Sequence, residues 1–384
     1  MTNTKKPLLF KITLVFLLIG VLASYEVGGS EPARAARGLP DSPEFGYGAR
    51  LDVWGQEVEL ALNAAAGVGI DWIGVDFVWA RHWPDSDRPI DLEALDKALE
   101  IAREQNLNVL LSISHPPAWA LGPAGPDINQ TSGLVVMLAN RYPENLMTIE
   151  LFPKANTAVG WGAPPDPSAY FQLLLACQKA LNAGARPVVL VAGGLSPLPA
   201  KPTDGDMDDL LFLDELYRAG AAANMPILSL RLNPLEGEAM APPSQDARQV
   251  LRHYEAVRQV MLQHDHANGL IWVTGFSWPQ DSLDNPTDRE IRWLNQAFHL
   301  MKSQLYIGVA FFERLNPGEN EQTPGSSAQS LIMKDTQGVR LHPALVTLGQ
   351  IITLNQGGHA SFQVFLYKKV TTGPAKSLWK QRQP

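Results

Sequence analysis

The stretch DWIGVDFVWA, residues 71–80, is a run of apolar and aromatic residues that is followed by an amphipathic helical pattern, DLEALDKALEIAREQN, at 91–106. A second apolar run, LNVLLSIS at 107–114, comes directly after that pattern. Nearly continuous apolar strands joined by a helix are typical of parallel strands whose two faces are both covered. This stretch therefore predicts a strand–helix–strand unit of an α/β protein.

The same alternation continues in both directions, from FGYGARLDV at 45–53 to YIGVAFF at 306–312. About eight strand-then-helix units in roughly 300 residues have the length and order of a (β/α)₈ barrel. The competing α/β fold, an open doubly wound sheet, would show a glycine-rich turn that opens a helix. The glycines of AGVGIDW at 66–72 precede a strand instead. We predict an α/β protein with one domain, a (β/α)₈ TIM barrel at residues 45–352.

The segments outside the barrel have other compositions. Residues 1–24 carry lysines, then an apolar run, then small residues, which is the order of a signal peptide or a membrane anchor. Residues 25–44 are rich in Gly, Pro, Ala and Ser and read as a linker, and residues 353–384 as a C-terminal strand and a basic tail. Either fate of the leader places the barrel outside the cytoplasm, secreted or membrane-anchored. Membrane contact is expected only through the N-terminal segment.

The composition excludes several function classes. A formal net charge of −8 and the lack of a basic stripe in the central body argue against nucleic acid as a partner. The only cysteine, Cys177, lies on the apolar side of a helical pattern, so we expect it to be buried and unbridged. No H-x-x-x-H, C-x-x-C or G-x-S-x-G motif occurs, so we predict neither a metal nor a cofactor.

Aromatic and polar residues gather after the predicted strands. In a barrel of this kind the ligand site lies at the C-terminal ends of the strands. Flat aromatic faces at such a rim suit the C–H faces of sugar rings, although packing in the core is the alternative for any one of them. The predicted ligand-binding cleft consists of Trp79, Trp83, His115, Trp119, Asn156, Trp161, Arg231, Asn233, Phe276, Trp278 and Glu313.

Five segments in order resemble the clan A glycoside hydrolases, retaining (β/α)₈ glycosidases that include cellulases, xylosidases and β-galactosidases. The resemblance covers residues 45–352 and implies a carbohydrate ligand. The five segments are GIDWIGVDFVWARHWP at 69–84, LNVLLSISHPPAWA at 107–120, GWGAPPDPSAY at 160–170, VVLVAGGLSP at 188–197 and LIMKDTQGVRLHPALVTL at 331–348.

The resemblance breaks at the two catalytic positions. In the family, the fourth strand ends in W-N-E-P-N, whose glutamate is the general acid/base, and the seventh in T-E-F-G-W, whose glutamate is the nucleophile. The first motif falls on FPKAN at 152–156, which puts Lys154 at the acid/base position. The second falls on TGFSW at 274–278, which puts Gly275 at the nucleophile position. The resemblance thus implies that both catalytic carboxylates are missing.

Two further positions depart from the family. The sixth strand, which often ends in H-x-Y, carries Arg231 and Asn233, and the arginine usual on the second strand is replaced by Gly74. A retaining glycosidase needs two carboxyl groups about 5–5.5 Å apart. Lysine, with an unperturbed pKa of about 10.4, is a poor acid at neutral pH, and glycine offers no functional group. We therefore expect no catalytic residue at the family positions.

Other carboxylates could have moved into the site. Glu150 lies four residues before Lys154 on an extended strand, about 13 Å deeper at roughly 3.3 Å per residue, so we expect it inside the barrel beside a basic residue. Asp76 and Glu313, on the second and eighth strands, are expected to be neighbours at the mouth and are the alternative catalytic pair.

Three functions remain open from the sequence. The first is an exported, non-catalytic barrel that binds carbohydrate, possibly acidic because of Lys154 and Arg231, or that is purely structural. The second is an active glycoside hydrolase that uses Asp76 and Glu313. The third is a protein-binding scaffold without a sugar ligand.

Overall fold

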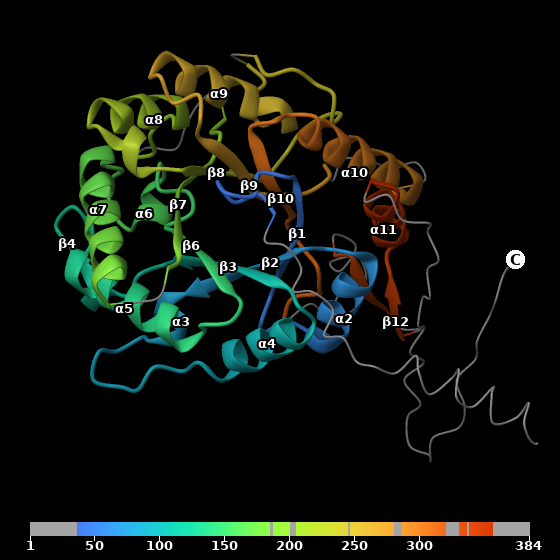
Figure 1. Cartoon of the computed structure of the whole chain (residues 1–384), viewed down its shortest axis with the longest axis horizontal. Coiled ribbons are helices and arrows are strands. Elements are labelled where there is room, and N and C mark those ends of the chain that lie inside the picture. Colours follow the sequence, from blue (N-terminus) through green and yellow to red (C-terminus); the bar gives the residue numbers. More distant parts are fainter. Residues whose placement is uncertain are drawn as a thin grey trace, which may run out of the picture. The chain divides into compact units, whose positions relative to one another are not determined.

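The computed structural model describes residues 37–184, 187–199, 205–244, 246–279, 286–319, 330–335 and 338–355. Its main feature is a closed barrel of eight parallel strands with helices around it, which confirms the predicted (β/α)₈ fold (Figure 1). The predicted leader, the first part of the predicted linker, and the C-terminal strand and tail beyond residue 355 lie outside the described residues.

The barrel strands follow one another in chain order, and the last pairs with the first. They are β1 (Gly46–Leu51), β2 (Trp72–Val78), β3 (Asn108–Ser114), β6 (Leu146–Leu151), β7 (Val189–Leu195), β8 (Ile227–Leu232), β9 (Leu270–Phe276) and β10 (Ile307–Phe312). Two hairpins lie outside the barrel: β4 (Leu121–Gly122) with β5 (Gly125–Pro126), and β11 (Ile332–Asp335) with β12 (Gly338–Leu341).

The long helices cover the outside of the barrel. They are α2 (Val58–Val68), α4 (Glu93–Glu104), α5 (Ile128–Arg141), α7 (Pro167–Gly184), α8 (Asp209–Arg218), α9 (Tyr254–Gln263), α10 (Pro286–Lys302) and α11 (Pro343–Asn355). Short helical turns in the loops are α3 (Trp79–His82), α6 (Ala158–Trp161), η1 (Ala118–Ala120), η2 (Ala221–Asn224) and η3 (Leu251–His253). Cys177 is buried on α7, as the sequence predicts.

The inside of the barrel has an apolar lower half and a polar upper half. Because successive side chains of a strand point to opposite faces, every second residue faces inward. Towards the base of the barrel, Trp72, Leu110, Trp272 and Phe311 form a small apolar cluster that is separate from the main core. Two residues further along, the inward positions are Gly74 and, with polar side chains, Ser112, Thr274 and Glu313, which comes just after β10. Polar chemistry is therefore concentrated towards the C-terminal mouth.

Residues 37–44, which the sequence assigns to the linker, instead close the base of the barrel. Leu39 is 6% exposed and packs in the lower apolar cluster. The indole nitrogen of Trp72 donates to the carbonyl of Arg37 at 2.9 Å, and that of Trp272 to the carbonyl of Gly38 at 2.8 Å. The folded body therefore begins before residue 45, because these indoles need polar partners that the barrel strands do not supply.

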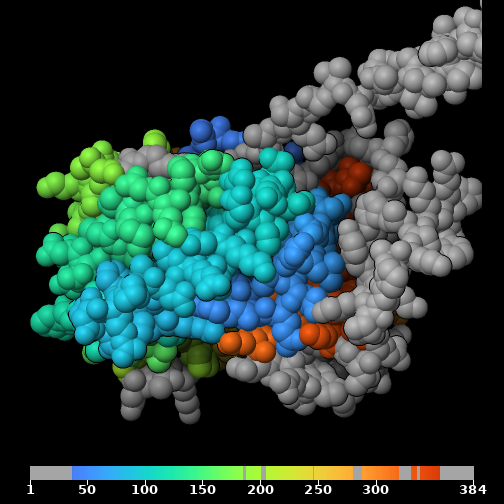
Figure 2. Space-filling model, turned by 90° about the horizontal axis from the view of Figure 1, so that it is seen from below, coloured from blue at the N-terminus to red at the C-terminus, as the bar shows by residue number. Residues whose placement is uncertain are grey.

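A surface groove lies outside the barrel mouth. Helices α2 and α4 lie side by side on the outside of the barrel, as their blue and cyan surfaces show in Figure 2. The groove, with a volume of about 870 Å³, lies between the loop after β1 and the start of α4, and Trp54, Glu57, Asp91 and Lys97 are among its lining residues. None of the predicted ligand-binding residues lines it. In the described part of the chain no helix is long and apolar enough to cross a membrane.

Candidate functional site

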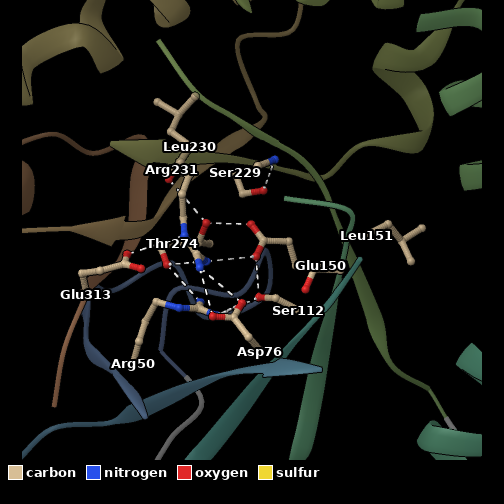
Figure 3. A network of polar contacts seen from close by, with 12 residues as sticks. Arg50, Asp76, Ser112, Glu150, Leu151, Ser229, Leu230, Arg231, Thr274 and Glu313 are labelled. Carbon is tan, nitrogen blue, oxygen red and sulfur yellow. Dashed lines mark hydrogen bonds and ion pairs between the residues drawn. The ribbon is translucent and has the colours of Figure 1, made fainter. Parts of the chain in front are cut away.

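A network of charged and hydroxyl side chains occupies the upper interior of the barrel (Figure 3). Its members come from strands all around the barrel, so the network forms only when the barrel is closed. They are Arg50 on β1, Asp76 on β2, Ser112 on β3, Glu150 on β6, Arg231 on β8, Thr274 on β9 and Glu313 directly after β10.

Glu150 lies at the centre of this network and is fully buried. Its carboxylate accepts hydrogen bonds from Ser112 Oγ at 2.5 Å and Thr274 Oγ1 at 2.6 Å. Arg231 Nη1 lies 4.0 Å from the same carboxylate. The prediction that Glu150 is an interior residue beside a basic neighbour is thus confirmed. Since buried charges persist only when they are paired and hydrogen-bonded, Glu150 serves to hold the network together.

Arg50 is the charged member of the network that was not predicted from the sequence, and the hydroxyl-bearing Ser112 and Thr274 were not predicted as site residues either. It is 3% exposed, and its Nη2 donates to Asp76 Oδ1 at 2.5 Å while its Nη1 donates to the carbonyl of Thr274 at 3.0 Å. A β-carbon added at Gly74 would lie 2.9 Å from Arg50 Nη1. The Arg50 guanidinium from β1 therefore fills the space that Gly74 leaves on β2.

Arg231 binds both members of the alternative acid pair. Its Nη2 donates to Asp76 Oδ2 at 3.1 Å, and its Nε lies 3.5 Å from Glu313 Oε2. The structure thus brings Asp76 and Glu313 to the same mouth with one guanidinium between them. The expectation that their strands are neighbours is wrong, because β1 lies between β2 and β10.

The ion pairs of Asp76 set its charge state. Desolvation favours the neutral acid, but the charges of Arg231 and Arg50 outweigh this effect and hold the pKa of Asp76 below its usual value. A general acid for glycoside hydrolysis needs a raised pKa, so that it still carries its proton near neutral pH. Asp76 is therefore a poor proton donor in this environment.

Gly275 has no room for a side chain. It is paired in register with Arg231 on the neighbouring strand, and a β-carbon added there would overlap Glu313 Oε2 and lie 2.7 Å from Arg231 Cδ. The Glu313 carboxylate therefore occupies the place where a nucleophile at position 275 would begin. Glu313 is partly accessible, with 22% of its side chain exposed.

Lys154 lies in the loop after β6, behind Phe152 and Pro153, and its backbone is in the left-handed region with φ of 64°. Its backbone N–H donates to the carbonyl of Gly194 at 2.7 Å, and its side chain is partly buried. No hydrogen bond or ion pair joins its amine to any residue that the structure describes. Burial lowers the pKa of Lys154 and the charge of Arg231 lowers it further, whereas Glu313 and Asp76 raise it without cancelling the shift.

Two glycines of β7 make the position of Lys154 possible. Gly193 and Gly194 both have positive φ, of 100° and 54°. A β-carbon on Gly194 would lie 2.5 Å from Pro153 Cα, which is a backbone atom that cannot move aside alone. Glycine at 194 therefore permits the close approach of the segment that carries Lys154.

Several predicted cleft residues lie in the core instead. Trp79, Trp161, Phe276 and Trp278 are at most 3% exposed, and they pack within the main core. Two short helices turn tryptophans into the core. Trp79 is the first residue of α3, and Trp161 is the last residue of α6, where its ring packs on Phe152. These side chains therefore pack inside the protein and present no free face to a ligand.

Asn156 is also fully buried. Its side-chain amide donates to the carbonyls of Ser196 and Met207 at 3.0 Å, and its Oδ1 accepts from the backbone N–H of Ser196 at 2.9 Å. These bonds fasten the loop after β6 to the loop after β7. Asn156 therefore shapes the mouth without facing it.

Of the remaining predicted cleft residues, Arg231 is buried, at 7% exposure, whereas the others are accessible. Trp83 and Trp119 are partly exposed, with ring centroids 4.8 Å apart in an edge-to-face arrangement, and Trp119 Nε1 donates to the carbonyl of Trp83 at 3.2 Å. His115 is exposed after β3, and Asn233 is partly exposed and accepts from Ser277 Oγ at 3.1 Å. Together with Lys154 and Glu313, these residues are the accessible part of the predicted site. Within the described ranges, no group of His, Cys, Asp and Glu side chains could hold a metal ion.

The comparisons with known proteins agree with the fold. The chain is similar to the family 39 glycoside hydrolase of Xanthomonas axonopodis pv. citri, with a TM-score of 0.58 and 15% identity over 83% of this chain and 68% of that one. It is equally similar in fold to the GH5_18 protein of Streptomyces cattleya in complex with GlcNAc, with a TM-score of 0.58 and 12% identity over 84% and 83% of the two chains.

A third neighbour is a family 39 glycoside hydrolase of the gut symbiont Bacteroides cellulosilyticus WH2, with a TM-score of 0.55 and 15% identity over 79% of this chain. The chain spans 63% of the length of that enzyme. No family model matches the sequence, and no curated protein does. At these identities the likeness shows a shared barrel fold, and function has to be argued from the site.

Proposed function

We propose that this protein is an exported barrel that binds carbohydrate at its C-terminal mouth and does not hydrolyse glycosides. The barrel is of the glycoside-hydrolase type, and the Trp83–Trp119 pair offers aromatic surface beside the mouth. The observation that carries the proposal is the placement of the carboxylates. Asp76, Glu150 and Glu313 all lie within 4.0 Å of the single guanidinium of Arg231.

Chemistry explains why this placement opposes hydrolysis. A retaining mechanism needs one carboxyl group that is protonated and another that is free to attack the anomeric carbon. Here Glu150 is buried, Asp76 is held in its charged form, and Glu313 faces Arg231. Lys154, at the family's acid/base position, brings positive charge where an oxocarbenium-like transition state would develop.

The amine of Lys154, which has no hydrogen-bond or ion-pair partner among the described residues, further favours an acidic sugar. While it is protonated, it can pair with the carboxylate of a uronate, whereas Arg231 is already engaged by protein carboxylates. A neutral oligosaccharide of the same length would lack this contact.

Binding and turnover together test the proposal. We expect calorimetric titration to show binding of oligosaccharides, tighter for uronic than for neutral ones, and no release of the aryl group from a panel of aryl glycosides. Trp83→Ala should weaken binding of both kinds, and Lys154→Met should remove the preference for uronic sugars. Trp54→Ala, in the separate groove, is the matched control.

Other outcomes would decide for another function. Aryl glycoside hydrolysis that disappears in Asp76→Asn or Glu313→Gln would establish a working hydrolase with relocated carboxylates. Failure of every sugar on a glycan array, with Trp83→Ala behaving like the unchanged protein, would refute carbohydrate binding and leave the scaffold role.

A further inference from the structure

The amine of Lys154 is in an unusual position for a lysine. Lysine side chains are mostly solvated or paired with a carboxylate. Lys154 is partly buried at the barrel mouth, and among the described residues its amine has no hydrogen-bond or ion-pair partner. The nearby carboxylates of Asp76 and Glu313 are directed to Arg231.

We propose that Lys154 is a nucleophile that forms a Schiff base with small hydroxylated aldehydes, such as the open-chain form of a reducing sugar. A lysine amine becomes reactive when it is desolvated or placed beside another cation. The first condition holds here because Lys154 is partly buried at the mouth, and the positive charge of Arg231 lowers the pKa of its amine further. This activity goes beyond the binding of intact oligosaccharides and does not depend on it.

The reaction balances without any further reagent. The neutral amine adds to the carbonyl carbon and gives a carbinolamine after a proton moves from nitrogen to oxygen. The proton that the ammonium released to solvent then protonates that hydroxyl group, which leaves as water while the nitrogen lone pair forms the carbon–nitrogen double bond of the protonated imine. The protonated imine carries the same single positive charge as the original ammonium, so Glu313 and Asp76 stabilise it as they stabilise the ammonium.

The mouth favours a hydroxylated aldehyde over an apolar one. Its accessible groups are the Glu313 carboxylate, His115 and Asn233, and a hydroxyl-bearing ligand can hydrogen-bond to such groups. The backbone of Lys154 is fixed by its hydrogen bond to the carbonyl of Gly194, which holds the base of the side chain in place.

Reductive trapping tests the proposal on the full chain. The protein is treated with glycolaldehyde and sodium cyanoborohydride at pH 7, which converts any imine to a stable secondary amine, and each lysine is followed by peptide mass mapping. We expect Lys154 to be modified several-fold faster than Lys97 and Lys179, which are exposed lysines on α4 and α7. Lys154→Arg keeps the cation but should show no modification at this position.

The pH profile separates reactivity from simple exposure. The advantage of Lys154 should shrink as the pH approaches about 10.4, the ordinary pKa of lysine, where the reference amines also lose their protons. Glu313→Gln removes a charge that favours the ammonium, so the midpoint of the Lys154 profile should move to lower pH. Modification of Lys154 no faster than of Lys97, or a midpoint that does not move in Glu313→Gln, would overturn the proposal. Neither result depends on whether oligosaccharides bind.

Discussion

At the scale of single residues, charged side chains at the mouth fill the space that glycines leave on neighbouring strands. Arg50 fills the space beside Gly74, and the Glu313 carboxylate fills the space beside Gly275. In both cases a glycine on one strand is matched by a long charged side chain from another. The inward position of the Glu313 carboxylate therefore requires that position 275 has no side chain.

This coupling can be measured with a double-mutant cycle. Gly275→Ala should lower the free energy of unfolding by roughly 1–3 kcal/mol, because its β-carbon overlaps the Glu313 carboxylate and crowds Arg231. In a Glu313→Ala background the same change should cost less, with a coupling of at least about 0.5 kcal/mol in urea denaturation.

Gly67→Ala is the matched control for this cycle. A β-carbon at Gly67, in α2, meets nothing within 4 Å, so its effect should be the same in either background. If Gly275→Ala and Glu313→Ala are also additive, the Glu313 carboxylate does not occupy the space beside position 275.

The polar interior could be read from the sequence only in part. The interior position of Glu150 was predicted correctly because four residues of extended strand place it about 13 Å deeper than Lys154, at roughly 3.3 Å per residue. Arg50 was missed although it stands in β1 at an inward position, in the alternating pattern that Asp76 and Ser112 follow on the next strands. The pattern marks inward polar residues, but the pairing among them depends on the register and closure of the barrel.

At the scale of elements, the end of β7 decides where Lys154 lies. Gly193 and Gly194 allow positive φ values near the end of the strand. Because Gly194 has no β-carbon, the backbone of residues 153–154 can pack directly against it. The sequence showed the motif G-G-L-x-P at this place but not its role, since close backbone approach between two loops has no local signal.

Gly194→Ala should therefore disturb both stability and reactivity. The added carbon meets Pro153 Cα, and the left-handed conformation disfavours alanine, so the free energy of unfolding should fall by roughly 1–3 kcal/mol. Displacement of residue 154 should also reduce the advantage of Lys154 over Lys97 in reductive trapping.

The control is Gly133→Ala, at an exposed site in α5 where a β-carbon meets nothing. Because alanine is the better helix former, this change should raise stability by up to about 1 kcal/mol and leave trapping unaffected. Equal behaviour of the two variants in both measurements would contradict the role assigned to Gly194.

The order and type of the elements were the predictable part of the fold. Apolar periodicity and turn residues are local, and they predicted the eight strands and most of the helices. The directions of the aromatic side chains were not predictable. Trp79 and Trp161 lie in short helices, and these are too short to give a periodic pattern in the sequence. The aromatic surface of the mouth is accordingly smaller than the sequence suggested.

At the scale of the whole molecule, the base of the barrel needs residues 37–44. A chain that begins at residue 45 loses the buried side chain of Leu39 and the carbonyl partners of Trp72 and Trp272. Its free energy of unfolding should be lower by roughly 2–4 kcal/mol than that of a chain that begins at residue 37. Comparison of the two urea denaturation midpoints checks this, and equal midpoints would show that the segment contributes nothing to stability.

The position of residue 37 also makes it a suitable point for attaching the protein to a solid support. In a barrel of parallel strands the base and the mouth are opposite ends, and Arg37 lies at the base beside Trp72. A bead or sensor chip attached at that residue holds the molecule at the base of the barrel. The mouth, which carries Lys154, then faces away from the support. Immobilisation there keeps the mouth open to the oligosaccharides and aldehydes used in the proposed tests, whereas attachment through side chains around the mouth would block it.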